Sequence, residues 1–328
     1  MTTSDTSADQ LAAGVIGVGS MGQHHARVYS ELPGAELVGV TDVDREAADS
    51  VATEYGTDAL DRETLLERAD IVSVAVPTPY HYDTAVACID NGVDLLIEKP
   101  FVEELDQGRA LAERAREAGV TLQVGHIERF NPATKVLTDI VPDLDIVAVD
   151  IDRLGPPVDR GGDDSVVMDL MIHDIDILLS LVDSEIESMA AAAREAGHAN
   201  VQFQFDNDAI ASLTASRLTQ QKVRQLSVTA ESCRVNVDFI SQTVEIHRHS
   251  TPEYIESNGD IRFRHESVVE RPIVDNGEPL KAELAAFVTA AREGSEPVVT
   301  TEDGLRVLEV ANEIEGQTEP TERMVPQQ

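Results

Sequence analysis

The sequence predicts a two-domain α/β protein, in which a doubly wound parallel sheet is followed by an α+β domain with a large, mostly antiparallel open sheet. Short apolar runs alternate with helical patterns up to about residue 124, which is typical of strands joined by crossover helices. Beyond about residue 145, longer stretches of alternating apolar and polar residues indicate antiparallel strands with one covered face. The 328 residues are enough for two domains with separate cores.

The first half of the chain predicts five buried strands. Each is a short apolar run, because a parallel sheet is covered on both faces. Four of the five helices between the strands end at glycine or proline, which are the usual stops. We expect strands at 12–18, 36–41, 71–76, 94–97 and 121–124, and helices at 21–30, 44–55, 62–68, 82–91 and 105–118.

The second half predicts a sheet with few helices. We expect strands at 146–153, 201–205, 209–216, 224–230, 234–239 and 243–247, a long helix at 166–181, and closing helices at 279–293 and 301–315. We therefore assign residues 11–128 to the first domain and 129–316 to the second, with flexible tails at 1–10 and 317–328.

The composition is strongly acidic, with 25 basic and 61 acidic residues and a formal net charge of −36. Such a surface repels phosphate backbones, so nucleic acid is not an expected partner. No apolar run approaches the ~18 residues of a membrane span, and the polar N-terminus has no signal-peptide pattern. Cys88 and Cys233 stand in no metal or redox spacing, which favours buried thiols in a reducing compartment. We expect a cytoplasmic protein, in a high-salt cytosol that screens the repulsion.

A glycine-rich motif follows the first predicted strand and opens the first predicted helix. It reads Gly17-Val18-Gly19-Ser20-Met21-Gly22. In this context Gly17 permits the tight turn, Gly19 lets a pyrophosphate approach the backbone, and Gly22 lets the helix pack on the strand. Asp42, at the end of the second strand, would accept hydrogen bonds from ribose hydroxyls and repel a 2′-phosphate. The motif therefore predicts NAD as the cofactor.

Two further segments follow predicted strands at the edge where such sheets bind ligands. In Glu98-Lys99-Pro100, one of only four lysines offers an ammonium group suited to a hydroxyl or to ribose oxygens, unless it is an ordinary surface lysine. Pro77 and Thr78 lie in a proline-stiffened turn that ends at His81, which either contacts the cofactor or caps the next helix.

Asp169, His173 and Asp176 recur at i, i+4 and i+7 in the long predicted helix, which would place them on one face. A carboxylate beside a histidine fixes its tautomer and raises its basicity, as a general base requires. A solvated acidic face is the alternative, and a metal site would need a third ligand that the spacing does not supply. The link at 125–132, including Arg129 and Asn131, is either a hinge or a set of polar groups that face a cleft between the domains.

These motifs occur together in a known family. Gly17-x-Gly19-x-x-Gly22-x-x-His25-Ala26, Glu98-Lys99-Pro100, Asp169-x-x-x-His173-x-x-Asp176 and the segments at 278–280 and 301–305 resemble the Gfo/Idh/MocA oxidoreductases. The resemblance implies a Rossmann domain that binds NAD, a C-terminal sheet that forms a homodimer or homotetramer interface, and oxidation of a sugar or polyol carbinol. It implies that Lys99 lies near the nicotinamide ribose and the reacting hydroxyl, that His173 is the expected general base, and that Asp169 is its partner or a substrate ligand. Either Lys99 or His173 takes the proton in members of the family, so the two are treated as a coupled set.

Two stretches, 124–132 and 167–176, resemble the branch that contains UDP-N-acetylglucosamine 3-dehydrogenases. The implied reaction oxidises the 3-hydroxyl of a nucleotide sugar to a ketone. A diphosphate needs cations, for which Arg129, Arg153 and Arg160 are candidates, whereas Asp163 and Asp164 would oppose an anion. The alternatives are a dehydrogenase of a neutral polyol such as inositol, and a nucleotide-sensing regulator without catalysis.

Overall fold

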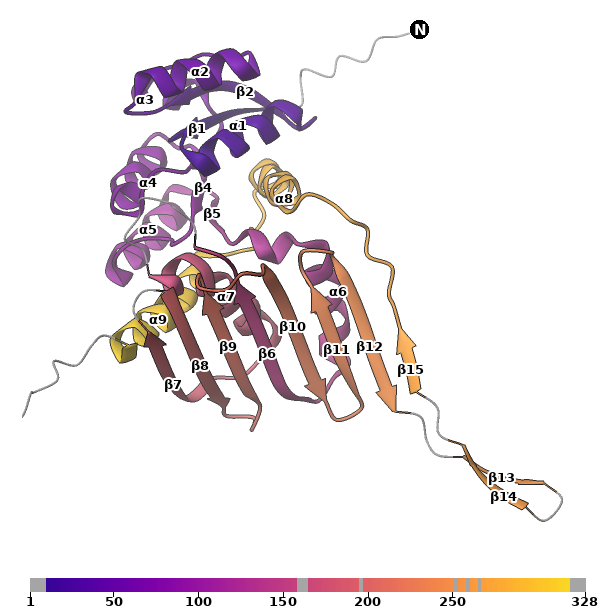
Figure 1. The fold of residues 1–328 in the computed structure, drawn as a ribbon. Helices are drawn as coiled ribbons and strands as arrows, with labels where there is room; N and C mark the ends of the chain where they lie inside the picture. The colour runs from indigo at the N-terminus through magenta and orange to yellow at the C-terminus, as the bar shows by residue number, and fades with distance from the viewer. Residues whose placement is uncertain are drawn as a thin grey trace, which may run out of the picture. The chain divides into compact units, whose positions relative to one another are not determined.

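The computed structural model describes residues 10–157, 165–194, 197–249, 253–257, 260–264 and 267–318 (Figure 1). Its contacts divide the chain into unit 1, Met1–Phe130 with Gly277–Glu309, and unit 2, Asn131–Asn276 with Val310–Gln328. The chain first passes from unit 1 to unit 2 after Phe130, two residues beyond the boundary at 128/129 that the sequence predicted. Gly277–Glu309, which the sequence-based division placed in the second domain, belongs to unit 1.

Unit 1 is built on a five-stranded parallel sheet of order β2-β1-β3-β4-β5. Its strands are β1 (Leu11–Ile16), β2 (Ala35–Thr41), β3 (Ile71–Val74), β4 (Asp94–Glu98) and β5 (Leu122–Gly125). Its helices are α1 (Ser20–Glu31), α2 (Arg45–Tyr55), α3 (Arg62–Arg68), α4 (His81–Asp90), α5 (Leu105–Ala118), α8 (Pro279–Glu293) and the first half of α9 (Thr301–Thr318), with short 3₁₀ turns at Thr78–Tyr80 and Ile127–Phe130. The predicted doubly wound parallel sheet is confirmed.

A sixth strand of this sheet is reduced to a single bridge. Ala59 pairs in parallel with Val40 on the outer side of β2, and Val40 exchanges backbone hydrogen bonds with Asp58 and Leu60. With this bridge counted, the strand order becomes that of a Rossmann sheet whose third strand is vestigial. The switch point, where nucleotides bind in such sheets, then lies between β1 and β3.

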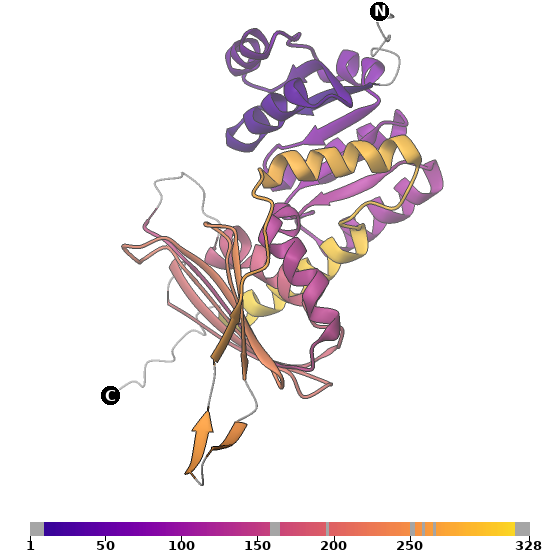
Figure 2. The same cartoon turned by 90° about the vertical axis from the view of Figure 1, so that its right-hand side faces the viewer.

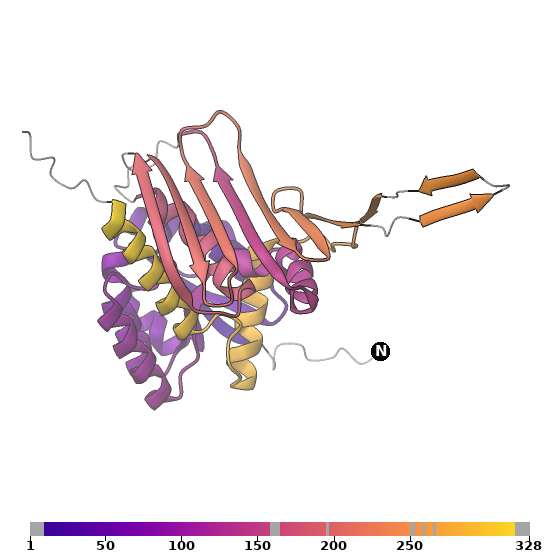
Figure 3. The same cartoon turned by 90° about the horizontal axis from the view of Figure 1, so that it is seen from below.

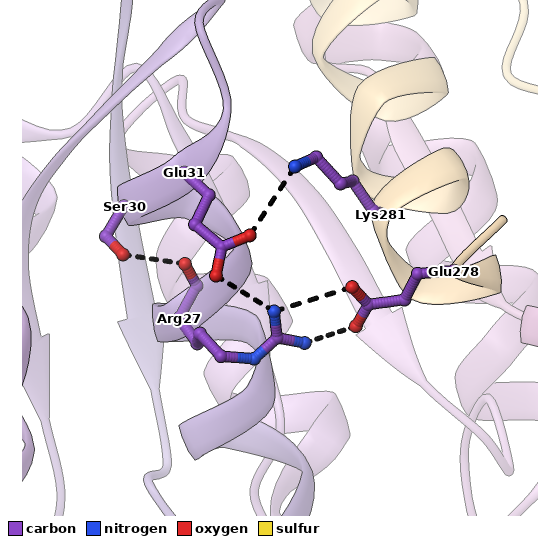
Figure 4. Close-up of polar contacts among 5 residues, drawn as sticks. All are labelled: Arg27, Ser30, Glu31, Glu278 and Lys281. Atoms are coloured by element: carbon purple, nitrogen blue, oxygen red, sulfur yellow. Dashed lines mark hydrogen bonds and ion pairs between the residues drawn. The ribbon is translucent and has the colours of Figure 1, made fainter.

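Helix α8 packs into the core of unit 1 although it is some 150 residues distant from β5 in the sequence. Leu280, Leu284, Phe287 and Val288 are buried in one cluster with residues of β1, β3, β4 and α1. Figure 2 shows the ribbon of α8, in yellow-orange, beside the elements of unit 1. At the surface, Arg27 of α1 pairs with Glu31 and Glu278, and Lys281 lies 3.4 Å from Glu31 (Figure 4). Apolar burial therefore fixes α8, and exposed ion pairs border the contact.

Unit 2 contains an eight-stranded sheet of order β15-β12-β11-β10-β6-β9-β8-β7, in which only β6 and β9 pair in parallel (Figure 3). The strands are β6 (Ile146–Leu154), β7 (Ile186–Arg194), β8 (His198–Phe205), β9 (Ile210–Ser216), β10 (Val223–Ala230), β11 (Cys233–Asp238), β12 (Thr243–His249) and β15 (Ser267–Glu270); β13 (Glu253–Ser257) and β14 (Asp260–Arg264) form a separate pair. The mostly antiparallel open sheet is confirmed. Side chains alternate between buried and exposed along β6, β8 and β11, and helices α6 (Pro132–Ile140) and α7 (Ile172–Leu181) pack on the covered face.

The long helix predicted at 166–181 is not a regular α-helix throughout. Val167–Met171 is a π-helical turn, and α7 begins at Ile172. A π turn holds more residues than an α turn, so side chains four apart do not stack across it as they do on an α-helix. Within the described part of the chain, no helix has both the length and the apolar character needed to cross a membrane.

Candidate functional site

The predicted cofactor residues of unit 1 share one edge of the parallel sheet. Strands β1, β2, β3 and β4 are parallel neighbours, so their carboxyl ends meet at this edge. The segments that follow them carry Gly17, Gly19, Ser20, Met21, Gly22, Asp42, Pro77, Thr78, His81 and Lys99. The chain thus brings together in space four motifs that are spread over some 80 residues of sequence.

The glycine turn has the shape that a dinucleotide requires. Gly17 has φ +91°, and a Cβ there would lie 2.7 Å from the carbonyl oxygen of Ala75. A Cβ on Gly22 would lie 1.8 Å from the carbonyl oxygen of Gly17, so only glycine lets α1 start this close to β1. At Gly19, by contrast, a Cβ would meet nothing within 4 Å. The backbone is therefore open on the side where phosphates bind a helix N-terminus.

The carboxylate of Asp42, directly after β2, is fixed by two backbone hydrogen bonds. One carboxylate oxygen accepts a 2.7 Å hydrogen bond from the N–H of Val18, and the other accepts 2.9 Å from the N–H of Asp44. Each oxygen keeps a lone pair for a further donor, such as a ribose hydroxyl. The glycine turn and this fixed carboxylate together fit NAD.

Lys99 follows a carboxylate that is buried in the core. Glu98 is 8% exposed, and its Oε1 lies 2.8 Å from Nε2 of His25, which is fully buried. Nδ1 of His25 lies 2.9 Å from the hydroxyl of Ser73, and that hydroxyl lies 2.9 Å from the hydroxyl of Tyr29. Burial raises the pKa of Glu98, but the hydrogen bond from His25 and the positive charge of Lys99 act against it, and the pKa lies below its ordinary value. Glu98, predicted as a cofactor ligand, therefore lies inside unit 1 as an ionised link to α1.

His81, whose role the sequence left open, is 1% exposed and starts α4. Its Nε2 lies 2.8 Å from the carbonyl oxygen of Val76, and its Nδ1 lies 3.0 Å from that of Pro100 and 3.2 Å from that of Phe101. It thus joins the end of β3 to the segment directly after Lys99.

In unit 2, Asp169 lies in the π turn and forms an ion pair with Arg217, at 2.8 Å between Oδ2 and Nη2. Arg217 directly follows β9, and sequence reasoning did not identify it because its partner lies 48 residues earlier. His173 is half-buried on the first turn of α7, whereas Asp176 is fully buried. The substrate-binding role of Asp176 stays a prediction.

The arginines and the asparagine predicted to bind substrate are placed differently from one another. Arg153 is 2% exposed and forms a buried ion pair with Asp174, with Nε 2.8 Å from Oδ1. Asn131 caps α6 through Ala133 and donates to the carbonyl oxygen of Phe239. Arg129 lies 3.6 Å from Asp303 within unit 1.

Both Arg153 and Asn131 thus hold the fold of unit 2, and their substrate role stays a prediction, as does that of Arg129. Arg160, Asp163 and Asp164 lie outside the described residues. No group of three or more His, Cys, Asp or Glu residues suited to a metal ion occurs among the residues that the structure describes.

Comparisons with known proteins agree with this geometry. Residues 11–126 match the family model described as "Oxidoreductase family, NAD-binding Rossmann fold", and residues 150–236 match the GFO/IDH/MocA C-terminal domain. UDP-N-acetylglucosamine 3-dehydrogenase of Acidithiobacillus ferrooxidans is 34% identical over 246 residues, which cover 72% of this chain and 77% of that protein. Its solved structure superposes with a TM-score of 0.86 over 94% of this chain and 98% of that chain. The scyllo-inositol 2-dehydrogenase (NAD(+)) of Bacillus subtilis is 31% identical over 63% of this chain and 68% of that protein.

The fold and the nucleotide edge define an NAD-binding oxidoreductase. The chain belongs to the Gfo/Idh/MocA family, and it is an NAD-dependent dehydrogenase of the sugar and polyol class, which acts on a CH–OH group.

Proposed function

We propose that the protein oxidises the 3-hydroxyl of UDP-N-acetylglucosamine, or of a related nucleotide sugar, to a ketone. The observation that carries this proposal is the likeness to the Acidithiobacillus enzyme, which extends over both units and nearly the full length of each chain. Oxidation removes a hydride from the carbinol carbon and a proton from its oxygen. NAD, when bound, supplies the hydride acceptor, and the protein must handle the proton.

Lys99 and His173 are the proposed proton-handling groups. An ammonium at Lys99 would hydrogen-bond to the reacting hydroxyl and stabilise negative charge on its oxygen. A neutral imidazole at His173 would accept the proton, and the two residues would act as a coupled set. Asp169 would orient the imidazole or a substrate hydroxyl, and Arg217 supports it because their ion pair fixes the carboxylate.

A neutral polyol is the second candidate substrate, because the inositol dehydrogenases among the relatives are nearly as similar in sequence. The two candidates differ in the charge that the protein must bind. All three described candidate arginines pair with a carboxylate, but the side chain of Arg153 is only 2% exposed, whereas those of Arg129 and Arg217 are 13% and 22% exposed. Among the described residues, a diphosphate would therefore depend on Arg129 and Arg217.

The decisive experiment follows NADH formation in multimolar KCl with NAD and UDP-N-acetylglucosamine, beside myo-inositol and a panel of free sugars. We expect turnover of the nucleotide sugar, with a KM that rises in Arg129→Gln while the KM for NAD does not. Turnover of a neutral polyol alone would replace the nucleotide-sugar assignment and leave the NAD site unaffected.

We also propose that the protein forms a homodimer or homotetramer through the open face of the unit 2 sheet. That face presents Asp150, Ser212, Ser227 and Arg234 at its centre, in a sheet of eight strands. Light scattering in multimolar KCl should give a multiple of the 35.5 kDa chain mass. Ser212→Arg should reduce that mass, and a monomeric wild type would contradict the proposal.

A further inference from the structure

Two buried histidines contact the residues on either side of the proposed catalytic lysine. His25 contacts Glu98, which precedes Lys99, and His81 contacts Pro100 and Phe101, which follow it. The two histidines come from different helices, α1 and α4, and both are at most 1% exposed. Neither side chain reaches the solvent, so neither can itself contact a substrate in this conformation.

The contacts of His25 form a directional chain. An ionised Glu98 can only accept, so Nε2 of His25 must carry the hydrogen of that bond. With a neutral imidazole, Nδ1 then accepts from the hydroxyl of Ser73, which in turn accepts from the hydroxyl of Tyr29. Every hydrogen then points toward Glu98, and burial in unit 1 strengthens each bond.

The contacts of His81 are of another kind, because carbonyl oxygens lie at both ring nitrogens. A carbonyl oxygen only accepts, so a neutral imidazole donates either to Val76 or to the pair Pro100 and Phe101. Donation from Nδ1 would hold the segment after Lys99, and donation from Nε2 would hold only the turn after β3. Amide side chains of different length can separate these two cases.

We propose that His25 and His81 are positioning residues that fix the backbone on either side of Lys99, and so aim its ammonium group at the reacting hydroxyl. The inference rests on the proposed role of Lys99. Two buried imidazoles cost stability unless their hydrogen-bonding groups are satisfied, and apolar side chains would pack this sheet without that cost. Their common feature is a direct hydrogen bond to a neighbour of Lys99.

The first test compares His25→Gln with His25→Leu. The Nε2 of glutamine reaches about as far as the Nε2 of histidine and can still donate to Glu98, whereas leucine cannot. We expect kcat to fall about 10- to 100-fold in His25→Leu, with the KM for NAD nearly unchanged, and to recover most of that loss in His25→Gln. His24→Leu, an exposed position on the same helix, is the matched control.

The second test compares His81→Asn with His81→Gln. Asparagine places its amide nitrogen near the position of Nδ1 and keeps the bond to Pro100 or Phe101, whereas glutamine reaches Val76 instead. We expect His81→Asn to keep kcat within a few-fold of wild type and His81→Gln to lose about tenfold, at similar melting temperatures. The reverse order, or equal values, would remove His81 from the proposal.

A readout independent of turnover comes from the four lysines of the chain, each of which gives its own NMR signal after ¹³C reductive methylation. The chemical shift of the Lys99 signal should move in His25→Leu and stay in place in His25→Gln, while the signals of Lys135, Lys222 and Lys281 do not move. If His25→Leu does not fold, Ser73→Ala should move the Lys99 signal instead. An unmoved signal in the folded variants overturns the inference.

Lys99→Met separates this inference from the proposed function. If Lys99→Met turns over normally, Lys99 has no catalytic role, and the histidines have no catalytic group to position. If Lys99→Met is inactive while the histidine variants match wild type in kcat and in the Lys99 signal, only the positioning inference is wrong.

Discussion

At the scale of single residues, Lys99 illustrates what sequence could and could not predict. A scarce residue type inside a strand-end motif indicated chemistry without any coordinates. The partners that hold this segment were not predictable, because His25 meets Ser73 across 48 residues and Glu98 across 73. Hydrophobic periodicity reports which face of an element is buried, but it says nothing about which distant polar group meets which.

Lys99→Met should lower kcat about 10²- to 10⁴-fold, because it removes the charge proposed to stabilise the reacting oxygen but keeps the length of the side chain. The binding of NADH, followed by its fluorescence, should weaken much less, because the glycine turn and Asp42 remain. Lys135→Met, at an exposed position, is the control. Full activity in Lys99→Met would refute the role.

The pH dependence of stability should report His81. Burial lowers the pKa of His81 below the ordinary 6.5, against its hydrogen bonds to neighbouring carbonyl oxygens and the charge of Glu98, which raise it. Between the pKa of His81 in the folded protein and 6.5, the unfolded chain binds more protons than the folded one. The contribution of neutral His81 to folding stability is therefore complete above pH 6.5 and is lost as the pH falls below it.

Urea titration from about pH 7.5 to 5 gives the free energy of unfolding of wild type and of His81→Asn. The difference between the two free energies should be constant above about pH 6.5. Below that pH it should shrink by up to about 1.4 kcal/mol per pH unit. The difference between the two proteins removes the contributions of the other histidines. Parallel stability curves over the whole range would contradict the assignment.

At the scale of elements, local sequence patterns predicted most helices correctly. The exceptions depend on contacts with other elements. The predicted bounds of α3, α5 and α8 agree with the structure. Strand β7 was missed because its run of alanines favours helix, and only its pairing with β8 along its length makes it a strand. Helix α6 was not predicted, although Asn131 followed by Pro132 is a helix-start signal. The pattern of α8 indicated a buried face but not that it packs in unit 1.

Phe287→Ala should therefore destabilise the NAD-binding unit, although residue 287 follows Asn131–Asn276, the larger segment of unit 2, in the sequence. Phe287 is fully buried in the core shared by α8 and the parallel sheet. Truncation should cost about 3–5 kcal/mol in the free energy of unfolding, measured by urea titration. Thr289→Ala, on the exposed face of α8, should stay within about 0.5 kcal/mol of wild type. Equal stabilities would show that α8 does not belong to this core.

At the scale of the whole molecule, the large negative charge should determine how salt affects stability. Exposed ion pairs such as those of Arg27 are weakened by salt, but each contributes little. The repulsion among 61 acidic residues against 25 basic ones acts over the entire surface and is also screened by salt. The second effect should outweigh the first, so salt should stabilise the protein.

The melting temperature should accordingly rise from dilute buffer to multimolar KCl. Sucrose at matched water activity serves as the control, because it alters solvation but does not screen charge. A melting temperature that does not depend on KCl would contradict the high-salt interpretation of the composition.

The chain passes between its two units three times, after Phe130, after Asn276 and within α9 after Glu309. Most of unit 2 is thus an insertion into unit 1. The last connection is made by α9, which continues without a break from unit 1 into unit 2. A fragment that stops at Phe130 would lack α8 and leave the apolar residues that it covers open to water. New substrate specificities could therefore not be acquired by simple end-to-end fusion of modules. Exchange between relatives would have to replace an internal segment with both of its junctions intact.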